Sequence, residues 1–497
     1  MITLLKQSES FKNRIAIVSK GKSYSYGQLL KTSKAVAANL LRETTDLNEA
    51  RVTFLIPPSF EYTAVQWGIW AGGGIAVPLC ILHPLPSIQY VLEDTQARIV
   101  IADAAYYDFL KPLEDHMGIS VITLESILKE TIVPLPDIDS SRRAMILYTS
   151  GTTSKPKGVV TTHATIEAQI TTLVNAWEWR KEDHILNILP LHHVHGIINV
   201  LSCALWSGAC CEFLPKFDAD KVWATIASER LTLFMAVPTI YYKLISFWEE
   251  LPATTQEVYS RAASQLRLMV SGSAALPVPV LEKWKEITGQ TLLERYGMTE
   301  IGMGLSNSYR GERRPGHVGL PLPGVEMRLV DSANRPVPEN TPGEYQIKGL
   351  SVFKEYWQKP EATKKAFTED GWFITGDIGM LSDGLYKILG RDSVDIIKSG
   401  GYKISALEIE DVLRKHDMVA DCAVVGLPDE EWGEVVSVCL IPKSKELDVE
   451  EVSSWLKTQL PAYKIPRKYM LSAELPRNVL GKVTKNELKK RWPAIAP

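Results

Sequence analysis

Short apolar runs recur along this sequence up to about residue 390, and longer amphipathic segments separate them. The clearest runs are Arg51–Ile56, Ala97–Ala102, Ala144–Tyr148, Ile185–Leu189, Leu231–Val237 and Leu266–Val270. Unbroken apolar runs of strand length are typical of strands that crossover helices bury on both faces. Such helices are predicted over Tyr62–Ala71, Trp223–Arg230 and Val280–Thr288. The pattern therefore predicts an α/β fold with stacked, mainly parallel sheets.

The pattern changes twice toward the C-terminus. Val318–Ile347 has many Pro and Gly residues between short alternating runs, which predicts a small antiparallel β region attached to the sheets. A compact unit follows Gly384–Arg391, with helix, strand, strand and helix expected over Leu407–Lys415, Val419–Val425, Val435–Ile441 and Val449–Gln459. We therefore expect an N-terminal domain over residues 1–391 and a small α+β domain over residues 392–497.

Length and charge narrow the class of protein. The chain has 497 residues, which exceeds the usual domain size of about 100–200 residues. Hydrophobic residues make up 45% and charged residues 23%, which is enough apolar material for a packed core. The formal net charge is only −3. This balance argues against nucleic acid or an anionic membrane surface as a partner.

One apolar stretch, Ala64–Leu82, has nearly the length of a membrane span. Gln66 is its one strongly polar residue, but Gly72-Gly73-Gly74 and Pro78 interrupt the stretch. A span needs about 20 apolar residues without such breaks. We therefore expect a helix, a turn and a buried strand here, and no membrane span.

The cysteines and the N-terminus suggest a reducing compartment. The six cysteines form no C-x-x-C pair and have no regular spacing, which favours buried free thiols over a disulfide framework or a zinc site. The first 14 residues include Lys6, Glu9, Lys12 and Arg14 and lack a long apolar segment, so we expect no secretory signal. The expected compartment is the cytoplasm.

A loop rich in hydroxyl groups follows the run Ala144–Tyr148. Residues 147–158 read L-Y-T-S-G-T-T-S-K-P-K-G, and such a loop presents backbone N–H, hydroxyl and ammonium groups to a polyphosphate. The spacing from Gly151 to Lys157 is wrong for a Walker A loop, and no G-K-[ST] follows, which excludes a P-loop kinase. A flexible Ser/Thr turn is the alternative, and so specific a string after a strand disfavours it.

This loop resembles the phosphate-binding signature of the adenylate-forming enzymes, the family of acyl-CoA synthetases, luciferases and peptide-synthetase adenylation domains. Ser154 stands where the family usually has glycine. Further family motifs follow in order: L-P-L-H-H-V-H-G from Leu189, S-G-S-A-A-L-P from Ser271, E-R-Y-G-M-T-E from Glu294, T-G-D from Thr375, G-R-D from Gly390, K-S-G-G from Lys398 and P-R-N-V-L-G-K from Pro476. The resemblance covers residues 149–482.

The resemblance implies an ATP site that binds Mg²⁺. Tyr296 offers an aromatic face to adenine, and Asp377 accepts hydrogen bonds from the ribose hydroxyls. Thr299 would donate to the α-phosphate, Arg391 would donate to ribose or phosphate, and Glu300 supplies a hard oxygen ligand for the metal. The implied ATP-binding residues are Thr149, Ser150, Gly151, Thr152, Thr153, Lys157, Gly272, Ser273, Ala274, Tyr296, Gly297, Thr299, Asp377 and Arg391.

The resemblance also implies the catalytic, acyl-binding and CoA-binding residues. Lys482 would bridge carboxylate and phosphate oxygens as charge develops, with Thr299 and His193 as the other catalytic residues. The acyl substrate would contact His193, His195, Ser271 and Arg295. Coenzyme A, as co-substrate, would contact Gly400, Gly401 and Trp432, although structural packing is the alternative role for Trp432. The C-terminal domain is expected to be mobile about a hinge at Asp392.

The three histidines of the sequence His192-His193-Val194-His195 could also suggest a metal site. On an extended segment, His193 and His195 would share one face and His192 would point the other way. No Cys or carboxylate lies nearby at ligand spacing, so zinc is disfavoured. The resemblance makes His193 a pocket wall or a gate. His195 is either a substrate contact or a hydrogen-bonded wall residue.

The expected reaction has two halves. A carboxylate attacks the α-phosphate of ATP to give an acyl-adenylate and pyrophosphate, and the thiol of CoA then displaces AMP. The E-R-Y-G-M-T-E motif and the His-rich stretch 189–196 resemble malonyl-CoA synthetases more than other branches of the family. Arg295 is the cation that a second carboxylate in the pocket would need. Malonate is therefore the expected acid.

Three alternatives remain open at this point. A medium- or long-chain fatty acyl-CoA synthetase would place Arg295 outside the acyl pocket. A stand-alone adenylation enzyme would transfer the acyl group to a carrier protein instead of CoA. A nucleotide-binding protein without catalytic activity is the third alternative, and Ser154 is the feature that suggests it.

Overall fold

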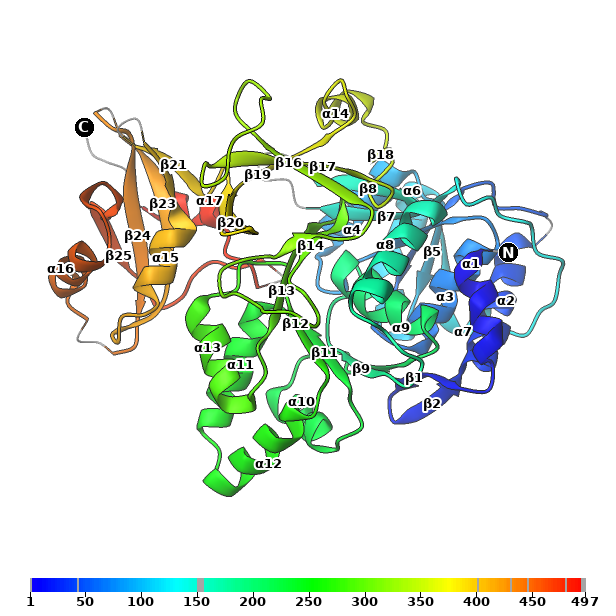
Figure 1. Ribbon diagram of the computed structural model, residues 1–497. Coiled ribbons are helices and arrows are strands. Elements are labelled where there is room, and N and C mark those ends of the chain that lie inside the picture. The colour runs from blue at the N-terminus through cyan, green and yellow to red at the C-terminus, as the bar shows by residue number, and fades with distance from the viewer. Residues whose placement is uncertain are drawn as a thin grey trace.

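The computed structural model of the chain describes residues 2–42, 44–149, 156–399, 402–429, 431–444, 447–478 and 481–492. Within these ranges the strands form four sheets. Figure 1 shows the chain passing from N-terminal helices (blue) through the large sheets with their helices (cyan to green) to a separate C-terminal unit (orange to red). The predicted α/β class, with a large N-terminal part and a smaller C-terminal part, is confirmed.

The largest sheet carries most of the candidate site. Its strands are β1 (Ile15–Ser19), β2 (Lys22–Ser25), β9 (His184–Asn187), β10 (Cys210–Phe213), β11 (Leu233–Ala236), β12 (Leu268–Ser271), β13 (Leu293–Met298), β14 (Gly302–Ser306) and β15 (Leu320–Pro321). Among the described residues their order is β15-β14-β13-β12-β11-β9-β10-β1-β2. The strands from β13 to β1 are parallel, and antiparallel strands lie at both edges. The central strands are the short apolar runs, buried on both faces.

A second sheet has the same plan. It contains β3 (Arg51–Leu55), β4 (Ile75–Pro78), β5 (Ile99–Ala102), β6 (Ser120–Thr123), β7 (Arg143–Thr149), β8 (Lys157–Thr162) and β18 (Glu355–Tyr356). Strands β7, β4, β3, β5 and β6 are parallel neighbours, whereas β8 and β18 are antiparallel at one edge. Thr149 at the end of β7 pairs with Lys157 at the start of β8, so the predicted phosphate loop joins two paired strand ends.

Helices connect these strands, and several pack between the two sheets. Their bounds are α1 (Thr3–Ser8), η1 (Glu9–Phe11), α2 (Tyr26–Leu41), α3 (Phe60–Ala71), α4 (Leu85–Thr95), α5 (Ala104–Leu110), α6 (Pro112–Met117), α7 (Leu124–Ile127), α8 (His163–Ala176), the π-helix η2 (His195–Ser202), α9 (Cys203–Trp206), α10 (Ala219–Ala227), α11 (Pro238–Glu249), α12 (Ala253–Ser264) and α13 (Val278–Thr288). Trp67 and Trp70 of α3 lie in one core cluster with Ile17 of β1 and Phe54 of β3. The stretch 64–82 is therefore a helix, a turn and a strand, as predicted.

Beyond the large sheets the chain forms two smaller ones. The first is antiparallel, with β16 (Val325–Val330), β17 (Gly343–Gly349), β19 (Phe373–Ser382) and β20 (Leu385–Arg391), and α14 (Pro360–Lys365) lies between β17 and β19 in the chain. The second contains β21 (Ile396–Ser399), β22 (Tyr402–Ser405), β23 (Val419–Asp429), β24 (Gly433–Pro442) and β25 (Lys468–Leu471). Its remaining elements are α15 (Ala406–Leu413), α16 (Val449–Gln459), η3 (Ala462–Lys464) and α17 (Lys485–Arg491). The predicted domain boundary falls between β20 and β21.

Two further features bear on the sequence predictions. Across the described residues, no helix is both long enough and apolar enough to cross a membrane. All six cysteines are free thiols, and five of them are buried. Burial raises the pKa of the Cys203 and Cys422 thiols well above its usual value, so both stay protonated.

Strand direction brings the predicted motifs together. Parallel strands β9, β11, β12 and β13 all end at the same edge of the largest sheet. The histidines and Thr239 follow β9 and β11, whereas the Ser271 and Glu294 motifs begin within β12 and β13. In open α/β sheets ligands bind outside the carboxyl ends of the strands. The candidate site is therefore built at this edge.

Candidate active site

The His-rich stretch begins where β9 ends. Asn187, the last residue of β9, accepts the N–H of Leu189 at 3.0 Å, and its Nδ2 donates to the carbonyl oxygen of Gly196 at 3.2 Å. These bonds fold the segment before His195 into a turn that leads into the π-helix η2. The segment over the histidines is therefore not extended, and the argument from its two faces does not apply, because the Asn187 side chain closes a turn there. π-Helical turns are frequent at functional sites.

Arg295 is a buried cation with unused donors. It lies in β13 and is only 3% exposed. Within the described residues, its Nε and Nη2 have no hydrogen-bond partner. Burial lowers the pKa of its guanidinium to about 9, so the group stays charged at neutral pH. A buried charge without a counter-charge is costly, and Arg295 is therefore suited to bind an anion.

Gly272 and His195 lie next to this guanidinium. A Cβ atom at Gly272 would lie 2.4 Å from Cζ of Arg295, so glycine leaves the room that the guanidinium occupies. Nδ1 of His195 lies 3.1 Å from Oγ of Ser273, while Nε2 has no partner in the described part of the chain. Burial, and then the Arg295 charge, hold the pKa of His195 well below its usual value, so this imidazole is neutral. This part of the site thus combines one cation with neutral polar groups.

Three other polar residues lie at this edge, of which Ser271 and His193 are predicted to contact the acyl group and Ser273 the nucleotide. Ser273 has φ of 71°, a conformation that non-glycine residues rarely adopt and that is found at functional sites. The Ser271 hydroxyl is buried and has no partner among the described residues. The His193 ring lies 4.6 Å from the His192 ring, and burial lowers the pKa of His193 to about 4. His193 is therefore a neutral side chain at neutral pH.

Asp377, Arg391 and Tyr296 form a connected group. Asp377 of β19 and Arg391 of β20 are cross-strand partners, and Nε of Arg391 donates to Oδ1 of Asp377 at 2.9 Å. The Tyr296 hydroxyl donates to Oδ2 of the same carboxylate at 2.7 Å. The residues predicted to bind adenine and ribose therefore meet from three different strands. A carboxylate accepts more than two hydrogen bonds, so Asp377 retains capacity for ribose hydroxyls.

Three further residues that are predicted to bind the nucleotide lie in or near the ends of β12 and β13. Gly297 allows β13 and β14 to approach closely, because a Cβ atom there would lie 2.2 Å from the carbonyl oxygen of Gly302. Thr299 is buried in the turn that follows β13. Ala274 is exposed in the loop after β12. The nucleotide-binding role of these three residues stays a prediction.

Glu300 lies in a mixed polar environment beside Tyr356. The Tyr356 hydroxyl donates to Oε1 of Glu300 at 3.0 Å, and Nζ of Lys157 lies 4.5 Å from the centre of the Tyr356 ring. Burial raises the pKa of the Glu300 carboxyl, and the charges of Arg391 and Lys157 oppose that shift. Lys157 and Arg391 therefore both lie near Glu300.

The donor set at Glu300 fits a metal that is held mainly by its substrate. Among the described residues, no three His, Cys, Asp or Glu side chains form a group that could hold a metal ion. Mg²⁺ binds proteins through one or two carboxylates and takes its other ligands from phosphates and waters. A single buried carboxylate beside two cations that attract phosphate is compatible with this mode of binding.

The C-terminal lysine motif reaches the same edge of the sheet. Asn478 and Lys482 close a tight turn, in which the N–H of Asn478 donates to the Lys482 carbonyl at 2.9 Å and the N–H of Lys482 donates to Oδ1 of Asn478 at 3.0 Å. A Cβ atom at Gly481 would lie 2.9 Å from Oγ1 of Thr239, the second residue of α11. Lys482 itself is exposed. Gly481, next to Lys482, therefore lies against the segment that follows β11.

The hinge and CoA residues have contacts of their own. Asp392 donates its N–H to the carbonyl oxygen of Gly376 at 3.0 Å and accepts a hydrogen bond from Nζ of Lys398 at 3.2 Å. Trp432 is partly buried, and Cζ of Arg467 lies 3.8 Å from its ring centre. The contact with Arg467 explains the position of the Trp432 ring without a bound ligand. The role of Trp432 in binding CoA therefore stays a prediction.

Six of the predicted site residues lie outside the described residues. They are Ser150, Gly151, Thr152, Thr153, Gly400 and Gly401. Ser154 lies outside them as well. The assigned roles of these residues in binding phosphate and CoA stay predictions.

Several contacts of the site have no short-range signal in the sequence. Tyr356 reaches Glu300 from a distant strand, and Asn187 holds the histidine turn through its side chain. Glu294 is buried, with Oε1 accepting the N–H of Leu276 at 3.1 Å. Within the described residues its Oε2 has no partner. Tyr356, Asn187 and Glu294 are single polar residues, and the partner of each is known only from the fold.

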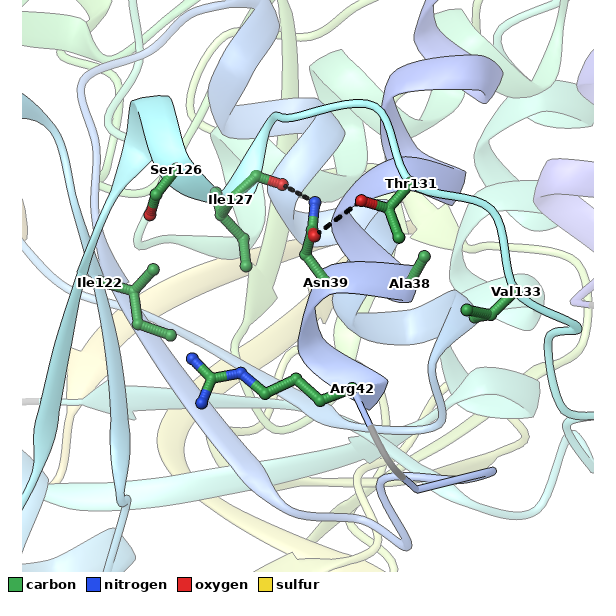
Figure 2. A pocket seen from close by; sticks show the side chains of 8 residues that line it. All are labelled: Ala38, Asn39, Arg42, Ile122, Ser126, Ile127, Thr131 and Val133. Carbon is green, nitrogen blue, oxygen red and sulfur yellow. Dashed lines mark hydrogen bonds between the residues drawn. The ribbon is translucent and has the colours of Figure 1, made fainter.

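A separate cavity of about 260 Å³ lies away from this edge. Figure 2 shows it between α2, β6 and α7, with Arg42 and Ile122 on one side. Nδ2 of Asn39 donates to the carbonyl oxygens of Ile127 at 3.0 Å and Lys129 at 2.7 Å. The cavity contains none of the predicted site residues and does not contribute to the candidate site.

Comparison with known proteins relates the chain to enzymes that bind AMP. Residues 4–357 match the family described as AMP-binding enzyme, and residues 408–482 match the AMP-binding enzyme C-terminal domain. The mitochondrial malonate–CoA ligase ACSF3 of Xenopus laevis is 44% identical, over 98% of this chain and 91% of its own length.

Two solved structures resemble the whole chain. ATP-bound MatB from Rhodopseudomonas palustris is 33% identical, covers 99% of both chains and gives a TM-score of 0.91. A malonyl-CoA ligase in a ternary product complex with methylmalonyl-CoA and AMP is 32% identical, covers 96% of this chain and 100% of its own, and gives a TM-score of 0.71.

The Glu294 carboxyl predicts a pH dependence of stability. Burial raises its pKa from 4.5 to about 8 in the folded chain, and Asp411 adds to that shift. The folded state therefore holds a proton that the unfolded state has released, and this contribution to stability is lost as pH rises from about 4.5 to 8. Glu294→Gln cannot ionise, so its melting temperature should fall less than that of the wild type between pH 6 and pH 8.5.

The matched control is Glu286→Gln on the exposed part of α13, which should melt with the pH dependence of the wild type. Equal pH dependence of the Glu294→Gln variant and the wild type would show that Glu294 is ionised in the folded chain.

Proposed function

We infer the reaction from the premise that this chain belongs to the AMP-binding enzyme family. It is an ATP-dependent acid–thiol ligase, which forms an acyl-adenylate and then an acyl-CoA. Its acid is malonate and its product malonyl-CoA. The observation that carries this specificity within the chain itself is the buried guanidinium of Arg295, whose Nε and Nη2 have no partner in the described part of the chain.

Arg295 distinguishes malonate from the alternative acids. A dicarboxylate that is activated at one end keeps a charged carboxylate at the other, and this charge would pair with Nε and Nη2 of Arg295. A fatty acyl chain would leave the guanidinium buried and unpaired. A medium- or long-chain synthetase requires Arg295 to lie outside the pocket, and its position beside Gly272 and His195 disfavours that alternative.

The first half-reaction depends on positioning and on charge. We assign Asp377, Arg391 and Tyr296 to the nucleoside and Lys157 to the phosphates, which would hold the α-phosphate near the acid bound at Arg295. The carboxylate oxygen then bonds to the α-phosphorus as the bond to the pyrophosphate oxygen breaks. Thr299 and Lys482 are assigned to the oxygens on which charge develops. Mg²⁺, held at Glu300, would neutralise part of the phosphate charge.

The second half-reaction requires the C-terminal domain to turn. The CoA sulfur attacks the acyl carbon, and the bond from that carbon to the AMP oxygen breaks. We assign Gly400 and Gly401 to the thiol path and Asp392 to the hinge. The TM-scores of 0.91 against the ATP-bound relative and 0.71 against the product complex, at nearly equal identity, support such a rearrangement. This chain is arranged like the ATP-bound relative, with the lysine loop at the site.

The thiol acceptor and the cellular compartment are the last two parts of the proposed function. CoA is the thiol acceptor, and no observation favours a carrier protein. We keep the cytoplasm as the proposed compartment because the cysteines are free thiols. The Xenopus laevis relative is named as mitochondrial, so cell fractionation is the measurement that decides the compartment.

The first prediction tests Arg295 with a panel of acids. In ATP–pyrophosphate exchange, the wild type should prefer malonate to butyrate and dodecanoate, and CoA should then give the thioester. Arg295→Ala should lower kcat/KM for malonate roughly 10- to 1000-fold, because it removes a charge-assisted contact in a closed pocket. The kcat/KM for butyrate should fall far less, or should rise.

Two outcomes would contradict this assignment. A wild-type preference for dodecanoate over malonate would exclude malonate as the acid. An equal decline for malonate and butyrate in Arg295→Ala would mean that Arg295 only braces the loop.

Gly272 provides an independent test of the same pocket. In Gly272→Ala the new methyl group would overlap the Arg295 guanidinium, which must then move. We expect kcat/KM for malonate to fall about tenfold or more, with butyrate much less affected. If kcat/KM falls by the same factor for both acids, Gly272 affects ATP binding and not the position of Arg295.

Lys482 should separate the two half-reactions. Lys482→Ala should leave ATP binding largely intact and slow adenylation about 100-fold or more, because the transition state loses a cation. Thioester formation from supplied malonyl-adenylate should survive. Lys490→Ala, on the exposed side of α17, is the control and should keep both activities. Equal loss of both half-reactions in Lys482→Ala would overturn the assignment.

A further inference from the structure

The segment between the two domains is held by the carboxylate of Asp395. This residue lies between β20 and β21, three positions beyond Asp392. Its Oδ2 accepts the N–H of Arg391 at 3.1 Å. The N–H groups of Val394 and Asp395 donate to the Arg391 carbonyl at 3.0 and 2.8 Å and close the turn. Asp395 is thus bonded to a residue on the other side of the proposed hinge.

The other oxygen of Asp395 binds a lysine of the C-terminal segment. Nζ of Lys485 lies 2.7 Å from Oδ1 of Asp395 and 2.7 Å from Oε1 of Glu410. The Lys485 side chain is only 6% exposed. Burial alone would raise the pKa of the Asp395 carboxyl, but the Lys485 charge, the Arg391 N–H and the Lys482 charge lower it overall. The pair is therefore a buried ion pair.

This ion pair connects the catalytic segment to the hinge. Lys485 begins α17 and lies three residues after Lys482, so its anchor limits where the lysine loop can lie. Arg391, whose N–H binds Asp395, uses its side chain to bind Asp377 at 2.9 Å. A continuous set of contacts therefore runs from the proposed ribose-binding residue through the hinge to the segment of Lys482.

We propose that Asp395 is a positioning residue that holds the hinge in the arrangement in which Lys482 reaches the ATP site, with Lys485 as its counter-charge. The proposal rests on the two-step function above. Rotation about Asp392 moves the Arg391 N–H away from Asp395, so that bond must break when the domain turns. The Asp395–Lys485 pair lies within the C-terminal domain and moves with it. Weakening this contact should therefore slow adenylation and spare thioester formation.

Half-reaction kinetics of the full-length chain test the proposal. Asp395→Asn keeps the shape of the side chain and removes its charge, and Lys485→Met removes the counter-charge. In both variants ATP–pyrophosphate exchange with malonate should fall roughly 5- to 150-fold, the usual range for coupling between sites. Thioester formation from supplied malonyl-adenylate should stay within about threefold of the wild type. Lys485→Arg keeps the charge and should restore most of the adenylation rate.

Lys489→Met is the matched control, since it removes a more exposed cation one turn further along α17 and should change neither rate. Equal slowing of both half-reactions would show that Asp395 only stabilises the fold, and unchanged adenylation would show that it does not hold the hinge. Failure of the wild type to activate malonate would instead count against the proposed function, so the two failures are distinguishable.

Discussion

The common direction of β9, β11, β12 and β13 is the constraint on which the site depends. Because these strands are parallel neighbours, the four segments that follow them meet at one edge of the largest sheet. Residues one hundred positions apart, His195 and Arg295, are thereby brought close together. The lysine loop reaches the same edge from the other domain, next to Thr239. A change in strand order would separate all of these groups at once.

Burial at this edge produces opposite effects on neighbouring residues of one strand. Side chains alternate between the faces of a strand, so Glu294 and Arg295 point to opposite sides of β13. Glu294 responds to burial by remaining protonated, because no cation pairs with it among the described residues. Arg295 retains its charge and leaves two nitrogens unpaired. Only the second response leaves donors for a charged ligand, and we therefore assign the distal carboxylate of the substrate to that face.

The sequence predicts the fold well where apolar patterns are continuous and less well where single polar side chains decide the structure. The buried runs identify β3, β7 and β11 because burial on both faces leaves no polar positions. The histidine turn has no periodic signal in the sequence, because the Asn187 side chain closes it. Motif order located Arg295 and Asp377, but the contacts of Gly272 with Arg295 and of Tyr356 with Glu300 depend on tertiary structure that no local pattern encodes.

The distribution of strong and weak contacts around the proposed hinge is suited to a two-step reaction. In the described residues, the hydrogen bonds that cross it include those of Arg391 with Val394 and Asp395, of Asp392 with Gly376 and of Ser405 with Leu389. A hydrogen bond to a charged group contributes about 1.5–3 kcal/mol, which shifts a two-state population by roughly one to two powers of ten. That bias favours one arrangement and still permits the other. The Lys485 pair with Asp395 and Glu410 lies within the C-terminal domain, where it would hold the segment of Lys482 in place without opposing the proposed rotation.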